Sequence, residues 1–306
     1  MRTHADGSPA AGKLYVVGTP IGNLGDLSPR AAQALSEADA VCCEDTRVTG
    51  KILAHIGKRK PLVRCDENVI EARAVGLVER MLAGETIAFA SDAGMPGVSD
   101  PGQVLVDAAR AEGVDVEVIP GPTACITALV SSGIACEHFF FEGFLPRKTG
   151  ERARRLAELA SVPGALLFYE SPHRAAATLA AIAEAYPRRE AALCRELTKL
   201  HEEVLRLPAA ELAREVAGRE ELKGEIVIVV APPDAEELAA LRAASPAGAS
   251  RSAADDIDAA LRTEIEAALD AGEAASAIAK RLSRRFSRKR RDVYALVLDM
   301  QDARLR

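Results

Sequence analysis

The stretch Thr86-Ile-Ala-Phe-Ala90-Ser91-Asp-Ala-Gly94-Met-Pro-Gly97-Val-Ser-Asp100-Pro-Gly102 decides the fold. It joins an apolar run of strand type to a turn that holds three glycines and two prolines, after which a helical pattern begins. A strand followed by a turn and a helix is the repeating unit of parallel α/β proteins. Because ligands of such proteins bind beyond the carboxyl ends of the strands, this turn is also the first candidate for a binding loop.

The same alternation of strand and helix patterns continues on both sides of this stretch. The first predicted sheet has the strands Lys13–Val17, Ala40–Cys43, Leu62–Arg64, Thr86–Ala90 and Asp115–Ile119. The second has the strands Phe139–Gly143, Ala165–Glu170, Ala191–Glu196, Glu203–Leu207 and Glu225–Val230. We expect the second sheet to be mixed, because the step from Glu196 to Glu203 is too short for a helical crossover.

Helix signals and composition divide the chain further. Ser28 before Pro29 predicts a capped helix start, and Asn68 with Glu71 three residues later predicts a capping box. Helical patterns also follow in the second half, at Thr149–Ala160 and Ser171–Tyr186. We expect α/β domains over residues 13–121 and 122–232, an Ala-, Ser- and Pro-rich linker over 233–255, and a helical module over 256–306.

Charge and apolar content exclude several classes of protein. The net charge of −6 argues against a protein that coats nucleic acid over its whole surface. Between Lys280 and Arg291, however, basic residues dominate and no acid appears, so a polyanion contact is expected to be local. No run of 18 apolar residues and no signal peptide is present, so we expect a cytoplasmic protein without a membrane segment. The six scattered cysteines, without a C-x-x-C pair, predict reduced core thiols and no metal site.

Four loops rich in glycine and proline follow predicted strands, and together they predict a ligand pocket. They are Gly18–Gly25, Ser91–Gly102, Pro120–Ala124 and Glu142–Arg147. The glycine spacing of the first loop matches neither G-x-G-x-x-G nor a phosphate loop, which disfavours a dinucleotide or a nucleoside triphosphate. An adenosyl ligand without a phosphate chain suits these loops, with Asp92 as the acid. The alternative, in which Asp92 caps its own turn, stays open.

Together, these segments resemble the tetrapyrrole methylase family. The resemblance is carried by Val17-Gly-Thr-Pro-Ile-Gly-Asn-Leu24, Glu44-Asp-Thr-Arg47, Ser91–Gly102, Pro120-Gly-Pro-Thr123, Phe141-Glu-Gly-Phe-Leu-Pro146, Tyr169-Glu-Ser-Pro-His-Arg174, Arg195-Glu-Leu-Thr-Lys199 and Lys223-Gly-Glu225. It implies two α/β domains of the tetrapyrrole methylase type with a cleft for S-adenosylmethionine (SAM) between them, a small C-terminal helical module, and a homodimer. Thr19-Pro-Ile-Gly-Asn23 replaces the Gly-Pro-Gly-Asp of small-molecule members, which favours the RNA-methylating branch.

The resemblance also implies a reaction and a set of cofactor contacts. The implied reaction is SAM-dependent 2′-O-methylation of a cytidine ribose in the decoding region of 16S ribosomal RNA, with that RNA or the 30S subunit as the partner. The implied SAM contacts are Pro20, Asp92, Gly94, Met95, Thr123 and Ala124, followed by Glu170 and Leu197.

Methyl transfer is an in-line substitution in which positioning matters most, but the ribose hydroxyl must still lose a proton to a carboxylate or a lysine. The candidate groups are Glu44 and Asp45 beside Arg47, Glu170 beside Arg174, and Glu196 beside Lys199. Each set equally fits a structural ion pair. His173, which follows a proline at a helix start, is expected to cap or pack rather than to titrate.

The basic residues of the loops and of the C-terminal module are the candidates for RNA contacts. They are Arg147, Lys148, Lys280, Arg281, Arg284, Arg285, Arg288, Lys289, Arg290 and Arg291, with further loop cations at Arg47, Lys51, Arg174 and Lys199. A solvated helix is the alternative interpretation of the C-terminal run. Two other functions stay open, namely C-methylation of a free tetrapyrrole and a non-catalytic RNA-binding factor. An ordinary Rossmann methyltransferase in which Asp45 binds the adenosine ribose is a further alternative.

Overall fold

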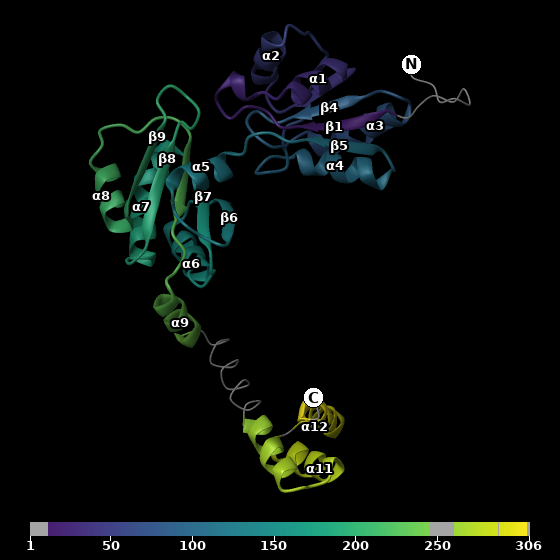
Figure 1. Ribbon diagram of the computed structural model, residues 1–306. Coiled ribbons are helices and arrows are strands. Elements are labelled where there is room, and N and C mark those ends of the chain that lie inside the picture. The colour runs from purple at the N-terminus through teal and green to yellow at the C-terminus, as the bar shows by residue number, and fades with distance from the viewer. Residues whose placement is uncertain (1–11, 245–259, 287, 305–306) are drawn as a thin grey trace. The chain divides into compact units, whose positions relative to one another are not determined.

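The computed structural model describes residues 12–244, 260–286 and 288–304 (Figure 1). The chain separates into two compact units, Met1–Pro233 and Asp234–Arg306. The first unit contains both sheets, and the second is helical. None of the described helices combines the length and the apolar character needed to cross a membrane.

The first sheet is parallel throughout, with the strand order β3-β2-β4-β1-β5. Its strands are β1 (Lys13–Val17), β2 (Ala40–Cys43), β3 (Leu62–Arg64), β4 (Ile87–Ala90) and β5 (Asp115–Ile119). Helices α1 (Pro29–Glu37) and α2 (Thr46–His55) cover one face, while α3 (Ile70–Leu82) and α4 (Gly102–Ala111) cover the other (Figure 1). The predicted strands are thus confirmed to within one residue. The central strands β1, β2 and β4 are almost completely buried and therefore read as short continuous apolar runs.

Of the two predicted helix starts in this sheet, one is confirmed and one is wrong. Ser28 accepts a hydrogen bond from the backbone amide of Ala31, as an N-cap should. Asn68 does not cap α3, whose first residue follows Val69 without any side-chain cap. Instead the carboxylate of Asp66 accepts from the backbone amide of Asn68 and its carbonyl accepts from that of Ile70, so the turn is organised two residues earlier.

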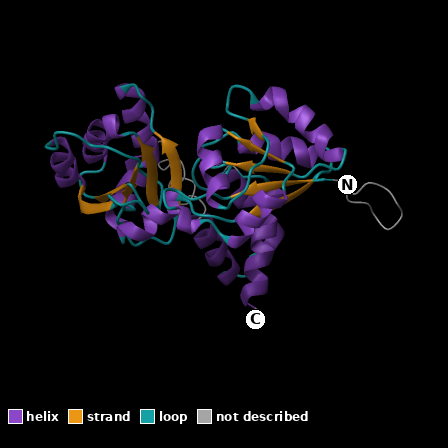
Figure 2. Ribbon diagram, turned by 90° about the horizontal axis from the view of Figure 1, so that it is seen from above, coloured by secondary structure: helices purple, strands orange, loops and turns teal. Residues whose placement is uncertain are grey.

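The second sheet is mixed and has the order β6-β7-β10-β8-β9. Its strands are β6 (Phe139–Phe144), β7 (Ala165–Glu170), β8 (Glu190–Arg195), β9 (Glu203–Pro208) and β10 (Ile226–Val230). Only the β6–β7 pair is parallel, and β8 and β9 form an antiparallel hairpin, which confirms the prediction from the short connection. Helix α5 (Ala124–Ser132) packs on one face, and α6 (Thr149–Leu159), α7 (Pro172–Ala185) and α8 (Ala209–Ala217) cover the strands from the other side (Figure 1). Figure 2 shows helices beside both groups of strands.

The mixed topology has one consequence for the site. Strand β10 runs antiparallel to both of its neighbours, and its first residue, Ile226, pairs with Glu170 at the end of β7 and with Arg195 at the end of β8. The start of β10 therefore lies at the same edge of the sheet as the carboxyl ends of β7 and β8.

The second unit has its own small core. It comprises α9 (Ala235–Ala244), a helix over residues 260–270, α11 (Ala275–Arg285) and α12 (Arg290–Arg304). The last three helices enclose the buried side chains Leu261, Ile265, Ala268, Ile278, Ala279, Leu282, Val293 and Val297. Helix α9 occupies the start of the predicted linker, and the rest of that linker, residues 245–255, lies outside the described residues.

Candidate active site

The loops that follow β1, β4 and β5 lie in direct contact. The backbones of Thr19 and Gly94 form a two-way bridge, with N–O distances of 2.9 and 3.2 Å. A Cβ atom built on Gly18 would lie 2.6 Å from the backbone nitrogen of Gly121, and one built on Gly121 would lie 2.8 Å from the backbone of Gly18. Glycine is required at both positions because the two main chains touch, so the convergence expected of these loops is present in the structure.

Side chains lock the same three loops together. Thr19 is fully buried, and its hydroxyl donates to the carbonyl of Ser91 at 3.0 Å. The sulfur of Met95 accepts from the backbone amide of Gly121 at 3.1 Å. Met95, a predicted SAM contact, therefore also holds the loop after β5 in place.

An apolar cavity of about 220 Å³ lies where these loops meet the second sheet. The loops after β1 and β4 contribute Ile21, Ala93 and Val98 to its lining. The remaining lining residues belong to α5, to the strands of the second sheet and to their loops, and they are Ala124, Phe144, Tyr169, Glu170, Cys194, Leu197, Glu225, Ile226 and Val227. The lining is mostly apolar, as is typical of small-molecule sites. We call this space the apolar cavity.

A second space of about 410 Å³, which we call the lysine cavity, shares Ile21, Ala93 and Glu225 with the first. Its other lining residues are Pro20, Gly22, Leu24, Val48, Lys51, Ile52, Asp92 and Lys199. Helix α2, the loop after β1 and the turn after β8 thus surround one space. The two cavities adjoin because they have these three residues in common.

Glu44 lines a third, acidic cavity with Glu67, Ser99, Asp100 and Pro101. Burial, together with the nearby charges of Asp100 and Asp92, raises the pKa of Glu44 from its ordinary value of 4.5 to about 7. A backbone hydrogen bond from Asp92 opposes this rise. A carboxylate with a pKa near neutrality is suited to accept a proton at physiological pH.

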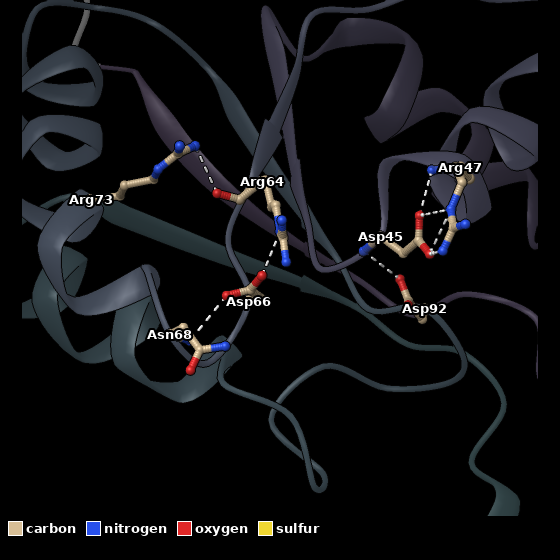
Figure 3. Close-up of polar contacts among 7 residues, drawn as sticks. All are labelled: Asp45, Arg47, Arg64, Asp66, Asn68, Arg73 and Asp92. Atoms are coloured by element: carbon tan, nitrogen blue, oxygen red, sulfur yellow. Dashed lines mark hydrogen bonds and ion pairs between the residues drawn. The ribbon is translucent and has the colours of Figure 1, made fainter.

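Asp92 connects two loops instead of capping its own turn (Figure 3). Its Oδ1 accepts from the backbone amide of Asp45 at 3.0 Å, and burial raises the pKa of its carboxyl group. Asp45 in turn caps α2 through the backbone amide of Arg47 and forms an ion pair with the Arg47 side chain, which lowers the pKa of Asp45 to about 2. Since both Asp45 oxygens are engaged by Arg47, the Rossmann alternative in which Asp45 binds a ribose has no support here.

Glu170 and Arg174 serve the structure of the second sheet. The Glu170 side chain is fully buried, and it accepts from the Ser171 amide at 2.8 Å and from the Thr178 hydroxyl at 2.7 Å. Arg174 pairs with Glu170 at 3.2 Å and donates to the carbonyl of Leu145 at 2.7 Å. This pair therefore anchors the loop after β6, and its groups are already occupied.

Lys199 lies between two carboxylates, at 2.8 Å from Glu196 and 3.2 Å from Glu225. Burial lowers its pKa, but the hydrogen bonds to Glu196 and Glu225 outweigh burial and raise the pKa above its ordinary value. A lysine held in its charged form is a poor proton acceptor. Its methylenes pack against the first loop, since a Cβ on Gly22 would lie 2.5 Å from the Cγ of Lys199.

The turn that carries Lys199 is conformationally strained. Glu196 and Thr198 have positive φ angles of 49° and 67°, a region that non-glycine residues seldom occupy. Between them Leu197 is buried and lines the apolar cavity. Strain of this kind persists only where the surroundings hold the backbone in place, and it is frequent at functional sites.

The structure thus brings the predicted cofactor contacts together. Ala124, Glu170 and Leu197 line the apolar cavity, Pro20 and Asp92 line the lysine cavity, and a Cβ built on Gly94 would lie 4.0 Å from the Cα of Thr123. Several lining residues were not predicted, among them Tyr169, Cys194, Ile226 and Val227. They follow from the mixed sheet, because the start of β10 adjoins the ends of β7 and β8. The sequence signal that could have identified these residues is the short connection after Glu196, which predicts antiparallel pairing and so brings the start of one strand to the carboxyl ends of others.

The predicted RNA contacts divide into paired and unpaired cations. In the described part of the chain, ion pairs join Lys148 to Glu151, Arg281 to Glu264 and Glu273, Arg285 to Glu264, and Arg291 to Asp292. Exposed cations without such a pair among the described residues are Arg147, Lys280, Arg284, Lys289 and Arg290. The basic run is therefore only partly neutralised within its own unit.

All six cysteines are free thiols, and five of them are buried. Within residues 12–244, 260–286 and 288–304, no group of three or more His, Cys, Asp or Glu side chains is arranged to hold a metal ion.

Comparison with known proteins agrees with this geometry. The family model for Tetrapyrrole (Corrin/Porphyrin) Methylases matches residues 13–213. Uroporphyrin-III C-methyltransferase from Thermus thermophilus, solved in complex with S-adenyl homocysteine, has the same fold, with a TM-score of 0.52 and 21% identity over 71% of this chain and 97% of that one. Fold and site together thus define a methylase of the tetrapyrrole methylase type.

Two curated relatives are more similar in sequence, and both are named ribosomal RNA small subunit methyltransferase I. The protein from Xylella fastidiosa (strain Temecula1) is 47% identical over 72% of this chain and 81% of its own length. That from Synechocystis sp. (strain PCC 6803) is 36% identical over 95% of this chain and 99% of its own length, so this match extends into the C-terminal unit. The chain therefore belongs to the tetrapyrrole methylase family, in the branch named ribosomal RNA small subunit methyltransferase I. This membership confirms the resemblance drawn from the motifs, the expected fold and the prediction of a methyltransferase.

Proposed function

We propose that this enzyme transfers the methyl group of SAM to the ribose 2′-oxygen of a cytidine in the decoding region of 16S ribosomal RNA. The observation that carries the proposal is the apolar cavity, which adjoins the lysine cavity where the strand-end loops of both sheets meet. The names of the relatives support ribosomal RNA as the substrate. The 2′-oxygen and the cytidine follow from the family alone.

The residues present fit an adenosyl cofactor. Gly18, Gly94 and Gly121 remove side chains where the loops approach most closely, which leaves main-chain groups and apolar walls around the cavity. Ala124 and Leu197 would contact the cofactor in the apolar cavity. Pro20 and Asp92 line the lysine cavity and would contact the cofactor from the side on which the two cavities adjoin, with Gly94, Met95 and Thr123 on the loops after β4 and β5. Glu170 would contribute through its backbone, since its carboxylate is occupied. When bound, SAM supplies an electrophilic methyl group on a sulfonium.

The protein's own tasks are to hold the ribose oxygen, exclude water and accept one proton. Among the candidate groups Glu44 is the best suited proton acceptor, because its pKa of about 7 leaves it ready to take up a proton at neutral pH. Glu44 directly follows β2 and lines the third cavity together with Ser99 and Asp100. These two residues belong to the loop after β4, which also contributes to the lining of the other two cavities. Asp45, Glu170 and Lys199 are held in ion pairs and would position their neighbours.

RNA contacts beyond the cleft would come from the unpaired cations of the C-terminal unit and from Arg147. These cations are exposed, and phosphate groups of the RNA would serve as their ionic partners. They are Lys280, Arg284, Lys289 and Arg290. Only seven phenylalanines, four tyrosines and no tryptophan are present, so stacking on bases would contribute less than contacts to phosphates.

We further propose that the enzyme acts as a cytoplasmic homodimer on the 30S subunit. Support for self-association comes from α5, whose outer face exposes Ile126 and Val130, the latter to 75%. Light scattering coupled to size exclusion would report twice the mass of 32.3 kDa, whereas a chain-sized mass at micromolar concentration would contradict the dimer.

Methyl transfer with analysis of the product tests the function. The full chain, incubated with isotope-labelled SAM and small-subunit particles that lack the modification, should yield labelled 2′-O-methylcytidine in the 16S RNA. Parallel reactions contain uroporphyrinogen in place of the particles. Label in the porphyrinoid alone would replace our proposal with the tetrapyrrole alternative, and no SAM binding at high micromolar concentration would favour the non-catalytic RNA-binding factor.

A further inference from the structure

The lysine cavity has one wall formed by a single face of α2. Val48, Lys51 and Ile52 are three and four residues apart, so their side chains share that face of the helix. The helix is fixed beside the cavity by its cap at Asp45, whose backbone amide is bound by Asp92. The position of this wall is therefore tied to the loop after β4.

Among the described residues, no acid neutralises Lys51, whereas the other cation of this cavity, Lys199, is paired. The acids around it already have partners, since Glu225 pairs with Lys199 at 3.2 Å and Asp92 accepts from the Asp45 amide at 3.0 Å. Lys51 is exposed, and no acidic side chain pairs with it in the part of the chain that the structure describes. An unpaired ammonium group at the rim of a cavity attracts an anion.

The rest of the lining suits a sugar and a base. Leu24 is 38% exposed although apolar, and together with Val48 it gives the cavity an open apolar surface. The volume of about 410 Å³ is larger than that of the apolar cavity, at about 220 Å³. The shared residues Ile21, Ala93 and Glu225 place any occupant next to the apolar cavity.

Building on the proposed function, we propose that the lysine cavity receives the ribonucleotide that is methylated, with Lys51 binding a phosphate group of that nucleotide. Leu24 and Val48 pack against its ribose or base. This binding site is separate from the basic run of the C-terminal unit, and it positions the reacting nucleotide instead of the whole RNA.

Lys51→Gln removes the charge, Lys51→Arg retains it, and Lys58→Gln is the matched control. Lys58 follows the same helix, is exposed, has no ion pair among the described residues and does not line the cavity. Methyl transfer by the full chain to unmodified small-subunit particles is measured over a series of salt concentrations, and SAM affinity is measured by calorimetry.

We expect Lys51→Gln to raise KM for the particles by about three- to tenfold and to lower the slope of log KM against log salt by about one, as the loss of one phosphate contact should. The SAM affinity should not change, and Lys51→Arg should retain most of the wild-type KM. Lys58→Gln should alter KM less than about twofold.

An unchanged KM in Lys51→Gln would overturn the proposal, and so would an equal rise in Lys58→Gln, which would indicate a diffuse basic face. A wild-type chain that transfers no methyl group to the particles contradicts the proposed function, not this site. Filter binding of the same particles then provides the same comparison between Lys51→Gln and Lys58→Gln.

Discussion

The candidate carboxylates of this enzyme differ in whether their surroundings leave them free to accept a proton. Asp45 and Glu170 are held by arginines, whereas Glu44 lies half-buried among other acids with a raised pKa. The sequence placed all three in candidate sets but did not rank them. Ranking required the neighbours from distant segments, such as Asp100 beside Glu44 and Thr178 beside Glu170, which no local spacing reveals.

The raised pKa of Glu44 predicts the pH profile. If Glu44 accepts the proton, kcat should fall about tenfold per pH unit below about 7, as the carboxylate becomes protonated. Glu44→Gln should reduce kcat by about 10²- to 10⁴-fold and remove that limb, while SAM affinity is retained. Values of kcat measured from pH 5 to 9 with saturating substrates provide the comparison. If Glu44→Gln showed the same fall of kcat below pH 7 as the wild type, another group would be the proton acceptor.

The same pKa has a consequence for stability. The folded chain holds a proton on Glu44 between its ordinary pKa of 4.5 and about 7, while the unfolded chain has released it. The free energy of unfolding should therefore decrease as the pH rises through this window, and Glu44→Gln should lack this component. Urea unfolding of both proteins at pH 5 and pH 7.5 measures the difference; equal pH dependence in the two would refute the assigned pKa.

At the scale of elements, the site depends on loops whose backbones touch. Gly121→Ala would place a Cβ 2.8 Å from the backbone of Gly18, so we expect a loss of about 1–3 kcal/mol in stability and weaker SAM binding. Gly76→Ala in α3 is the matched control because no atom lies within 4 Å of the added Cβ, and it should stabilise the helix by about 0.5–1 kcal/mol. Thermal unfolding and SAM calorimetry test both. Equal effects of the two substitutions would show that the loop contact is unimportant.

Elements were the most predictable level of this structure. Short apolar runs such as Ala40–Cys43 are fully buried, which is why their ends could be read from the sequence. The predicted cap of α3 at Asn68 was wrong because Asp66 organises this turn instead, through both its carbonyl and its carboxylate. The lining contributed by β10 was missed because it depends on which strands become neighbours, and strand order is a property of the whole sheet.

At the scale of the whole molecule, we propose that the first unit carries the chemistry and that most contacts to RNA outside the cleft come from the second unit. Gln substitutions of the unpaired Lys280, Arg284, Lys289 and Arg290 should weaken binding to small-subunit particles, with SAM affinity unchanged. The slope of log Kd for the particles against log salt concentration should decrease by up to about four. Replacing the ion-paired Arg281 and Arg285 is the control, and its effect on the slope should be smaller. Filter binding between 50 and 300 mM salt measures both. A SAM affinity that falls with the first set would contradict the separation of roles.

The central claim is that the apolar cavity formed by loops of both sheets binds SAM, and calorimetric titration of the full chain tests it most directly. Wild type and Ala54→Leu, which adds the same bulk at an exposed helical position away from the cavity, should bind one SAM per chain with similar affinity. Ala124→Leu, which fills the cavity, should weaken binding at least about tenfold while thermal unfolding shows an intact fold. Wild-type affinity in a folded Ala124→Leu variant would show that SAM binds elsewhere and would contradict the account.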